Sequence, residues 1–238
     1  MKEFIKSFVR AVGYIFHRNR DSKVIYYHDL GTKYTDMGTD FKLFVNHIER
    51  VRSLGYNLVD RITKKNNEVM VCFDDGWLGI YSYRDYFKKE GFFPTIFIAV
   101  DLIGTDGFLT SSQILEMQNE GFHFESHTWT HTGLPDHSGS DLMHEIEDSK
   151  YYLENLLGRK INDICFPQGR YNQNIVKICE QVGYKHMFSS INGGFFKLQP
   201  EKLICRNLMQ DVPEKDVKYI LLGDSVIQRM RLKRLHTS

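Results

Sequence analysis

The sequence predicts an α/β fold, because short apolar runs alternate with amphipathic segments, the pattern of βαβ units around a parallel sheet. Glycine follows several of the amphipathic segments, a common signal for the end of a helix. With 238 residues, 42% of them hydrophobic, the chain can furnish one large core, and α/β barrels often use this length as one domain. We therefore expect an N-terminal helical segment over residues 1–23 and one domain over residues 24–238.

Each expected strand is a short apolar run, and each expected helix has apolar residues at helical spacing. Residues 41–54 show the second pattern clearly, since Phe44, Ile48 and Val51 recur three or four positions apart and Gly55 follows. The expected strands cover 24–27, 57–59, 69–73, 95–100, 122–125, 163–166, 187–189 and 203–205. The expected helices cover 41–54, 79–89, 111–119, 140–157, 173–182 and 214–234.

Two acidic residues and two histidines are the strongest functional signal. Asp74 and Asp75 end the apolar run 69–73, so a buried strand would deliver both carboxylates to its open end, where α/β barrels keep their chemistry. His127 and His131 follow another expected strand. Three N and O ligands with an open coordination position are typical of a catalytic zinc-type site, whereas structural zinc takes four ligands rich in Cys. Together the four residues indicate a metal beside a base.

Each half of this pattern has a plainer interpretation when it is taken alone. Asp-Asp-Gly after a strand is commonly a turn, since Asp bonds its own backbone and Gly accepts positive φ. An isolated H-x-x-x-H is a weak signal, and Thr128 stands where a zincin helix carries its Glu, which excludes that metalloprotease motif. The joint occurrence of both halves favours a site.

Three ordered motifs carry a family resemblance. Residues 73–76 read Phe-Asp-Asp-Gly, 126–131 read Ser-His-Thr-Trp-Thr-His, and 166–172 read Phe-Pro-Gln-Gly-Arg-Tyr-Asn. In this order they resemble the first three motifs of the polysaccharide deacetylase (NodB homology, carbohydrate esterase 4) family, and the resemblance runs from about residue 24 to residue 194. It implies a distorted (β/α)7 barrel of the NodB homology type. It also implies a metal-dependent hydrolase that removes N-acetyl, or O-acetyl, groups from a polysaccharide or oligosaccharide.

The same resemblance assigns roles to single residues. It implies Asp75, His127 and His131 as metal ligands and Asp74 as the base for a metal-activated water. The backbone N–H of Gln168, which follows the motif proline, is implied as the donor to the oxyanion. Zinc is the expected ion, although N and O ligands also suit cobalt, nickel or iron. The implied substrate is an acetylated amino-sugar glycan.

The proton donor to the departing amine is not where many family members carry it. Their late Leu-x-His motif has no counterpart, since residues 219–224 read Tyr-Ile-Leu-Leu-Gly-Asp. Near the other end, an apolar strand ends in His28-Asp29 and resembles the circularly permuted order of poly-N-acetylglucosamine deacetylases. The first and last strands of a closed barrel are neighbours, so a strand can change termini and keep its place beside the site. We expect His28 as the general acid, with a capping or solvated histidine as the alternative.

Other positions depart from the family pattern. Cys165 stands two residues before the motif proline, where many members have an arginine that orients the base. Arg206 or Arg170 could supply that charge, although a surface or structural salt bridge is the more common role for either. Core packing is the more common use of aromatic side chains, with sugar stacking as the alternative for Trp77, Trp129, Tyr171 and Phe195.

Composition and the terminal segments restrict the partners and the location that we expect. A formal net charge of +1 gives no field for nucleic acid, so no such partner is expected. The four cysteines show neither C-x-x-C spacing nor a disulfide framework, which favours buried thiols in a reducing compartment. Residues 1–20 show no cleavage site, so we expect no signal peptide and a cytoplasmic location. Peripheral membrane contact, through the N-terminal helix or the basic tail 229–234, stays as an alternative to packing on the domain.

Two further functions stay open at this point. The lack of a secretion signal is compatible with deacetylation or deformylation of a cytosolic or lipid-linked sugar precursor. From a different class, the chain could be an inactive carbohydrate-binding module on the same barrel. The intact pair of carboxylates and pair of histidines argues against that module, since binding alone needs no base beside a metal.

Overall fold

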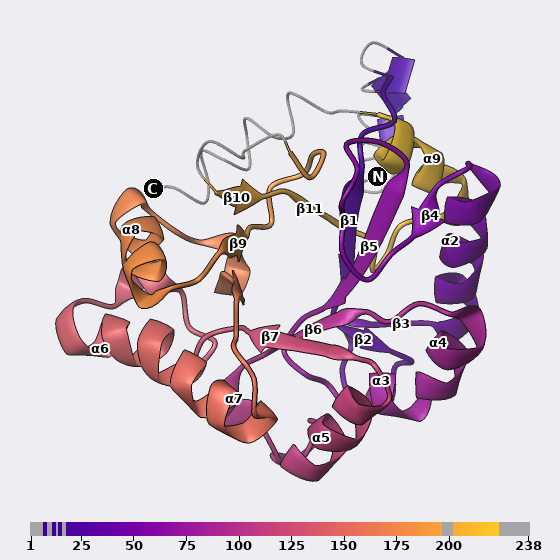
Figure 1. Ribbon diagram of the computed structural model, residues 1–238. Helices are drawn as coiled ribbons and strands as arrows, with labels where there is room; N and C mark the ends of the chain where they lie inside the picture. Colours follow the sequence, from indigo (N-terminus) through magenta and orange to yellow (C-terminus); the bar gives the residue numbers. More distant parts are fainter. Residues whose placement is uncertain (1–6, 9–10, 13, 16–17, 197–201, 224–238) are drawn as a thin grey trace.

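The computed structural model describes residues 7–8, 11–12, 14–15, 18–196 and 202–223. Parallel strands form a nearly closed barrel in its centre, and the helices lie around the outside of these strands (Figure 1). The expected α/β architecture is therefore confirmed. No helix within the described residues is long and apolar enough to cross a membrane.

Six strands pair side by side in the barrel wall, in the order β9-β8-β7-β6-β5-β1. The seventh position is shared by two short strands separated by one residue, of which β10 pairs with β9 and β11 pairs with β1. The chain thus closes the gap between β9 and β1 with one interrupted strand, which confirms the expected distorted (β/α)7 barrel. The wall strands are β1 (Lys23–Tyr27), β5 (Glu68–Phe73), β6 (Thr95–Ile98), β7 (His123–Ser126), β8 (Asp163–Cys165), β9 (His186–Phe188), β10 (Leu203–Ile204) and β11 (Arg206–Leu208).

The helices that cover the strands begin and end where cap residues predict. Thr110 forms a capping box with Gln113 at the start of α5, and Asn172 caps α8, which ends before Gly183 in the left-handed region. The helices are α2 (Phe41–Ser53), α3 (Gly79–Ser82), α4 (Arg84–Glu90), α5 (Ser111–Asn119), α6 (Gly139–Met143), α7 (Ser149–Leu157), α8 (Gln173–Val182) and α9 (Val217–Leu222). Short strands β2 (Asp29–Leu30) and β3 (Gly38–Thr39) pair with each other, and β4 (Asn57–Leu58) pairs with β5.

Three expected helices differ in the structure. The expected helix 79–89 divides at Tyr83 into α3 and α4, and 140–157 is interrupted by the π-helical turn η3 (His144–Asp148). The expected helix 214–234 begins as the 3-10 turn η6 (Glu214–Asp216) and continues as α9, and its part beyond residue 223 lies outside the described residues. Strand β11 was not expected at all, because the run 203–205 was taken to end at Cys205.

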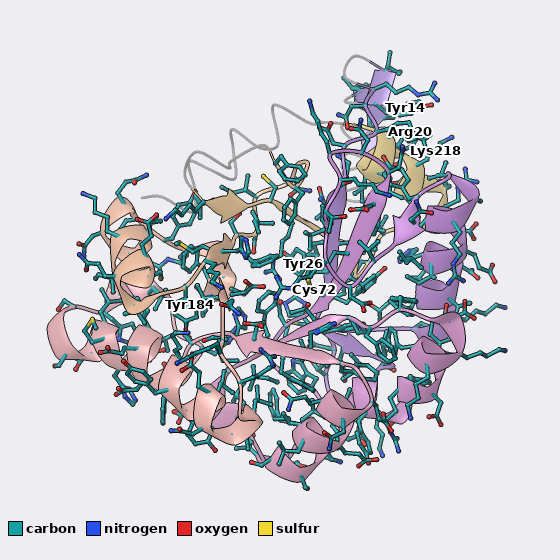
Figure 2. All side chains as sticks on the ribbon, in the orientation of Figure 1. Tyr14, Arg20, Tyr26, Cys72, Tyr184 and Lys218 are labelled. Carbon is teal, nitrogen blue, oxygen red and sulfur yellow. The ribbon has the colours of Figure 1, made fainter. Side chains whose placement is uncertain are left out.

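The strands have two buried faces. The side chains of Val24, Tyr26, Met70 and Cys72 belong to a cluster inside the barrel, and Figure 2 labels Tyr26 and Cys72 in the space that the strands enclose. The alternate residues of the same strands pack outward against the helices. Because side chains alternate along a strand, position 28 after β1 and position 74 after β5 share the inward direction. The four cysteines are buried and form no disulfide, as expected.

In the N-terminal segment, residues 7–8, 11–12 and 14–15 are helical, whereas the described residues from 18 onward are not. The ring of Tyr14 lies 5.5 Å from that of Tyr219 on α9, whereas Phe8 and Ile15 are 63% and 69% exposed. One face of this segment therefore packs on the domain. The basic tail 229–234 lies outside the described residues.

Candidate functional site

Three ligand-type side chains meet at the carboxyl ends of the barrel strands. Asp75 follows β5, and His127 and His131 follow β7. Asp75 Oδ1 lies 3.3 Å from His127 Nε2 and 3.0 Å from His131 Nε2, and the three atoms lie within 4.8 Å of one another. Zinc bonds of about 2.1 Å in tetrahedral geometry separate neighbouring ligand atoms by roughly 3.4 Å. The set that the sequence predicts therefore has the spacing of a three-ligand metal site.

The chemistry of these atoms also fits a cation. Asp75 is 3% exposed, and its Oδ1 is buried without a hydrogen-bond donor among the described residues. His127 Nδ1 donates to the carbonyl oxygen of Cys165 over 2.8 Å, so in the neutral ring Nε2 carries the lone pair that faces Asp75. Burial raises the pKa of Asp75, but without an ion the protonated forms of the two neighbouring imidazoles outweigh it and hold that pKa well below its usual range. An ionised carboxylate facing imidazole lone pairs is a favourable donor set for a divalent ion.

A tryptophan holds the other oxygen of the same carboxylate. Trp77 Nε1 donates to Asp75 Oδ2 over 3.0 Å, and its ring stacks on Phe108 with centroids 4.0 Å apart. Asp75 and Gly76 have φ of 72° and 88°, so the Asp-Asp-Gly segment is also a left-handed turn. The turn is therefore compatible with a site, because it aims Asp75 at the two histidines. The sequence offered only packing or stacking for Trp77 and missed its hydrogen bond.

Asp74 is held by an arginine from a distant part of the chain. Arg206 Nη1 and Nη2 donate to Asp74 Oδ1 and Oδ2 over 2.6 and 2.9 Å, and Arg206 Nε donates to Ser189 O over 3.0 Å. Both side chains are buried. Burial raises the pKa of Asp74, but the charge of Arg206 contributes to a net lowering, so the carboxylate stays ionised. A surface salt bridge is thus wrong for Arg206, because this arginine forms a buried pair with Asp74, the expected base.

The cysteine that replaces the family's usual arginine lies beside the same carboxylate. Cys165 Sγ is 3.9 and 4.0 Å from the two oxygens of Asp74, and burial raises the pKa of the thiol well above its usual range. Asp74, His127 and Cys165 form a second close group of ligand types. A protonated thiol and a carboxylate already bound by Arg206 are poor metal ligands, so the Asp75 set is the better candidate.

Two signals in the sequence could have identified Arg206. One is the cysteine at the expected arginine position, which leaves the base without a partner. The other is the position of Arg206 two residues after Ile204, which faces the inside of the barrel. The guanidinium lies 4.1 Å from the ring centroid of Tyr26 and 5.5 Å from that of Phe97, inside the barrel. Arg170, the other candidate, pairs with Asp136 at the surface, as expected.

His28 lies at the inward position after β1. Its Nδ1 donates to Gln210 Oε1 over 2.7 Å, which leaves Nε2 free to face a substrate. Its ring is 6.1 Å from that of Tyr26. The charge of His28 is also among the smaller influences, after burial and Arg206, on the pKa of Asp74. His28 is therefore within electrostatic reach of the expected base, and Gln210 is a partner that the sequence did not indicate.

Gln168 follows β8 in the 3-10 turn η4 (Pro167–Gly169), so it lies at the same end of the barrel. It is exposed and has a φ of 56°. A β-carbon on Gly169 would lie 2.7 Å from the side chain of Ser190, so this turn requires glycine there.

The other candidate aromatics pack against the protein. Tyr171 is buried and stacks on Phe166, and Trp129 lies 4.4 Å from the ring of His144. Phe195 packs against the cluster inside the barrel and lines a cavity with residues such as Met70. Packing, the more common use, therefore describes these three residues.

Comparisons with known proteins agree with the three motifs. Residues 61–187 match the model of the polysaccharide deacetylase family. The Bacillus subtilis protein YxkH, whose name assigns it provisionally to the polysaccharide deacetylases, is 30% identical over 175 residues. This match covers 68% of the chain and 62% of YxkH, so the chain spans less than two thirds of that relative.

Solved structures share the barrel. The Streptococcus pyogenes deacetylase PplD superposes with a TM-score of 0.75 at 21% identity, over 84% of this chain and 98% of PplD. IcaB from Ammonifex degensii superposes with a TM-score of 0.75 at 19% identity, over 86% of this chain and 98% of IcaB. At these identities the likeness establishes the fold.

Proposed function

The chain belongs to the polysaccharide deacetylase family, and from that premise we propose that it is a metal-dependent hydrolase that removes acetyl groups from an amino-sugar polysaccharide or oligosaccharide. One observation carries the proposal. The ligand atoms of Asp75, His127 and His131 converge beside a buried Asp74 that Arg206 keeps ionised. A binding module needs no such base, so the geometry favours catalysis.

In this proposal residues 24–238 are the catalytic domain and zinc is the ion, with cobalt or nickel suited to the same ligands. A divalent ion held by Asp75, His127 and His131 would polarise the acetyl carbonyl and lower the pKa of the attacking water. Asp74 accepts the proton of that water. Each oxygen of Asp74 keeps a lone pair beyond the one that Arg206 uses, so the base can act without leaving its partner.

The remaining residues act on the tetrahedral intermediate. The backbone N–H of Gln168 donates to the oxyanion, a contribution typical of acyl-transfer sites. His28, protonated on both ring nitrogens, donates its Nε2 proton to the amide nitrogen as the carbon–nitrogen bond breaks, so acetate and a free amine leave and the ring becomes neutral. Gln210 accepts from His28 Nδ1 and fixes the orientation of the ring.

The test is acetate release by purified protein that has been stripped of metal and reloaded with zinc. We expect release from N-acetylglucosamine oligomers, reversible loss on chelation, and a loss of at least about 100-fold in Asp74→Asn. Arg170→Ala, which breaks a surface pair, is the control and should keep full activity.

Other outcomes distinguish the alternatives. Activity on a nucleotide sugar or lipid-linked sugar, and not on oligomers, would support a role in precursor synthesis. If the zinc-loaded protein releases no acetate from any of these substrates, and Asp74→Asn binds glycan as well as the wild type, the chain is a binding module and the proposal fails.

A further inference from the structure

Residues 127–131, which contain both histidine ligands, form a segment named here the ligand loop. The helix that packs beside the ligand loop contains a π-helical turn. α6 passes into η3 (His144–Asp148) and then into α7, so the helix carries a wide turn where one continuous α-helix was expected. Such turns are rare and are often found at functional sites. An inserted residue rotates the preceding part of a helix by roughly 100° relative to the part that follows. The turn therefore decides which way the side chains of residues 144–148 point.

Side chains from two elements support this turn. Ser149 Oγ donates to Glu145 O over 2.7 Å, and Tyr184 Oη donates to Ile146 O over 3.0 Å. Tyr184 is one of the side chains labelled in Figure 2 and comes from the segment between α8 and β9. Backbone carbonyls near a π-turn need such donors, because the regular pattern of helical hydrogen bonds is broken there. The turn is thus a stabilised feature of the fold.

The turn aims one carboxylate at the segment between the two histidine ligands. Glu145 is 1% exposed, and its Oε2 accepts from the N–H groups of Trp129 and Thr130, both over 3.0 Å. Its Oε1 accepts from Thr130 Oγ1 over 2.6 Å. A buried carboxylate is costly unless it is hydrogen-bonded, and here three donors from one short segment satisfy it.

The segment that Glu145 binds has a strained backbone. Thr128 and His131 have φ of 69° and 63°, in the left-handed region that residues with a β-carbon rarely adopt. On its other side the segment is bound through its carbonyls, since Asp101 N donates to Trp129 O over 2.9 Å. Strained conformations persist only when surrounding contacts determine them. Glu145 supplies the contacts on the N–H side.

We propose that Glu145 is a positioning residue that sets the affinity of the metal site by fixing His131 relative to His127. The inference rests on the proposed metal-dependent function. It adds that the π-turn, supported by Tyr184, is the device that brings this carboxylate to the ligand loop. The hydrogen bonds of Glu145 go to residues 129 and 130, so it holds the backbone between the two histidine ligands.

Zinc affinity of the metal-free protein tests this role directly, by competition with a chromophoric chelator. Glu145→Ala removes all three acceptor interactions and should weaken zinc binding about 10-fold or more. Glu145→Gln keeps an oxygen for the two N–H groups and offers its amide to Thr130 Oγ1, so its affinity should lie closer to that of the wild type. Glu147→Ala is the matched control, because Glu147 lies in the same turn and, among the described residues, accepts one long hydrogen bond, from Tyr151 Oη at 3.4 Å. It should bind zinc as the wild type does.

Thermal unfolding of the metal-free variants separates positioning from general stability. If Glu145→Ala lowers the melting temperature but binds zinc as tightly as Glu147→Ala, the inference fails and the proposed function stands. If the wild type itself binds no zinc, cobalt or nickel, both fail. If Glu145→Ala does not fold, Tyr184→Phe replaces it, because it removes one donor to the π-turn and keeps every side chain of residues 127–131. Weaker zinc binding by Tyr184→Phe supports the inference, and unchanged binding overturns it.

Discussion

Arg206 and Asp74 are 132 positions apart in the sequence and meet inside the barrel through two parallel hydrogen bonds of 2.6 and 2.9 Å. A planar guanidinium matches both carboxylate oxygens at once, which an ammonium group cannot do. This pairing fixes the plane of the base and opposes the effect of burial on its pKa.

Arg206→Lys keeps a positive charge but loses the bidentate hydrogen bonding to Asp74. We expect turnover at saturating zinc to fall about 10- to 100-fold, because Asp74 is less firmly oriented. The pKa of Asp74 should rise toward its ordinary value, so the acidic limb of the pH–rate profile should move to higher pH. Arg170→Lys at the surface is the control. Equal profiles for both variants would show that Arg206 does not tune the base.

Arg206→Leu should destabilise the protein, because it leaves the charge of Asp74 buried without a partner. Breaking a buried pair in this way costs about 3–5 kcal/mol. Since the pKa of Asp74 is lowered on folding, the stability from this pair is present above the unfolded pKa and is lost as the pH falls through the folded pKa. Urea unfolding should therefore show a difference between wild type and Arg206→Leu that shrinks in acid. A constant difference would contradict the linkage.

His28→Ala should lower turnover by about two to four orders of magnitude with zinc content retained, the usual worth of a general acid. Gln210→Glu would place a carboxylate on the ring nitrogen opposite the substrate. The carboxylate stabilises the imidazolium, so activity should extend to higher pH, whereas Gln210→Ala should lose turnover without that extension. If His28→Ala retains full turnover, the assignment of the acid is wrong.

Trp77→Phe removes the donor to Asp75 Oδ2 and keeps an aromatic ring against Phe108. We expect zinc affinity to fall about 10-fold, because the partner that orients a metal ligand is lost. Phe108→Leu removes the stacking and keeps the indole, so it should bind zinc nearly as the wild type does. If Phe108→Leu instead binds zinc more weakly than Trp77→Phe, then ring packing, and not the hydrogen bond, orients Asp75.

The buried Asp29 should give the stability of the folded state a pH dependence of the opposite sign to that from Asp74. Burial raises the pKa of Asp29 to about 7, although hydrogen bonds from the backbone of Leu30 and Ile80 act in the other direction. Between its unfolded pKa and about 7 the folded state holds a proton that the unfolded state has lost. The stability of the folded state therefore falls as the pH rises, by up to about 1.4 kcal/mol per pH unit.

Asp29→Asn carries no ionisable proton, so it removes this dependence. Urea unfolding at about pH 5 and about pH 8 should show the wild type losing stability relative to Asp29→Asn at the higher pH. Asp36→Asn, at an exposed position, is the control. A difference that does not change with pH would show that Asp29 stays ionised in the fold.

Local signals in the sequence predicted much of the fold. The helices over 111–119 and 173–182 are confirmed to the residue, because their caps and following glycines are encoded beside them. The π-turn was missed because apolar spacing reports only which face of a helix is buried. Its cause lies in distant side chains such as Tyr184, which no local pattern reveals.

The candidate site also combines residues that local sequence predicts with partners that come from distant parts of the chain. The converging set of Asp75, His127 and His131 could be predicted, since each residue lies in the segment that follows a strand and barrel strands end together. Of the partners that hold the site, only Arg206 could be suggested from the sequence, as one of two arginines that could replace the missing motif arginine. Gln210 and Glu145 could not be predicted, because their roles depend on which strands and helices become neighbours.

The interrupted strand formed by β10 and β11 has a consequence for biosynthesis. A nascent chain that has emerged as far as His131 already carries all three ligand residues, yet the partner of its base arrives only with Arg206, in the strand that joins the two edges of the wall. A barrel whose last wall strand has not docked therefore lacks the partner that keeps Asp74 ionised, and in the proposed mechanism it lacks a working base.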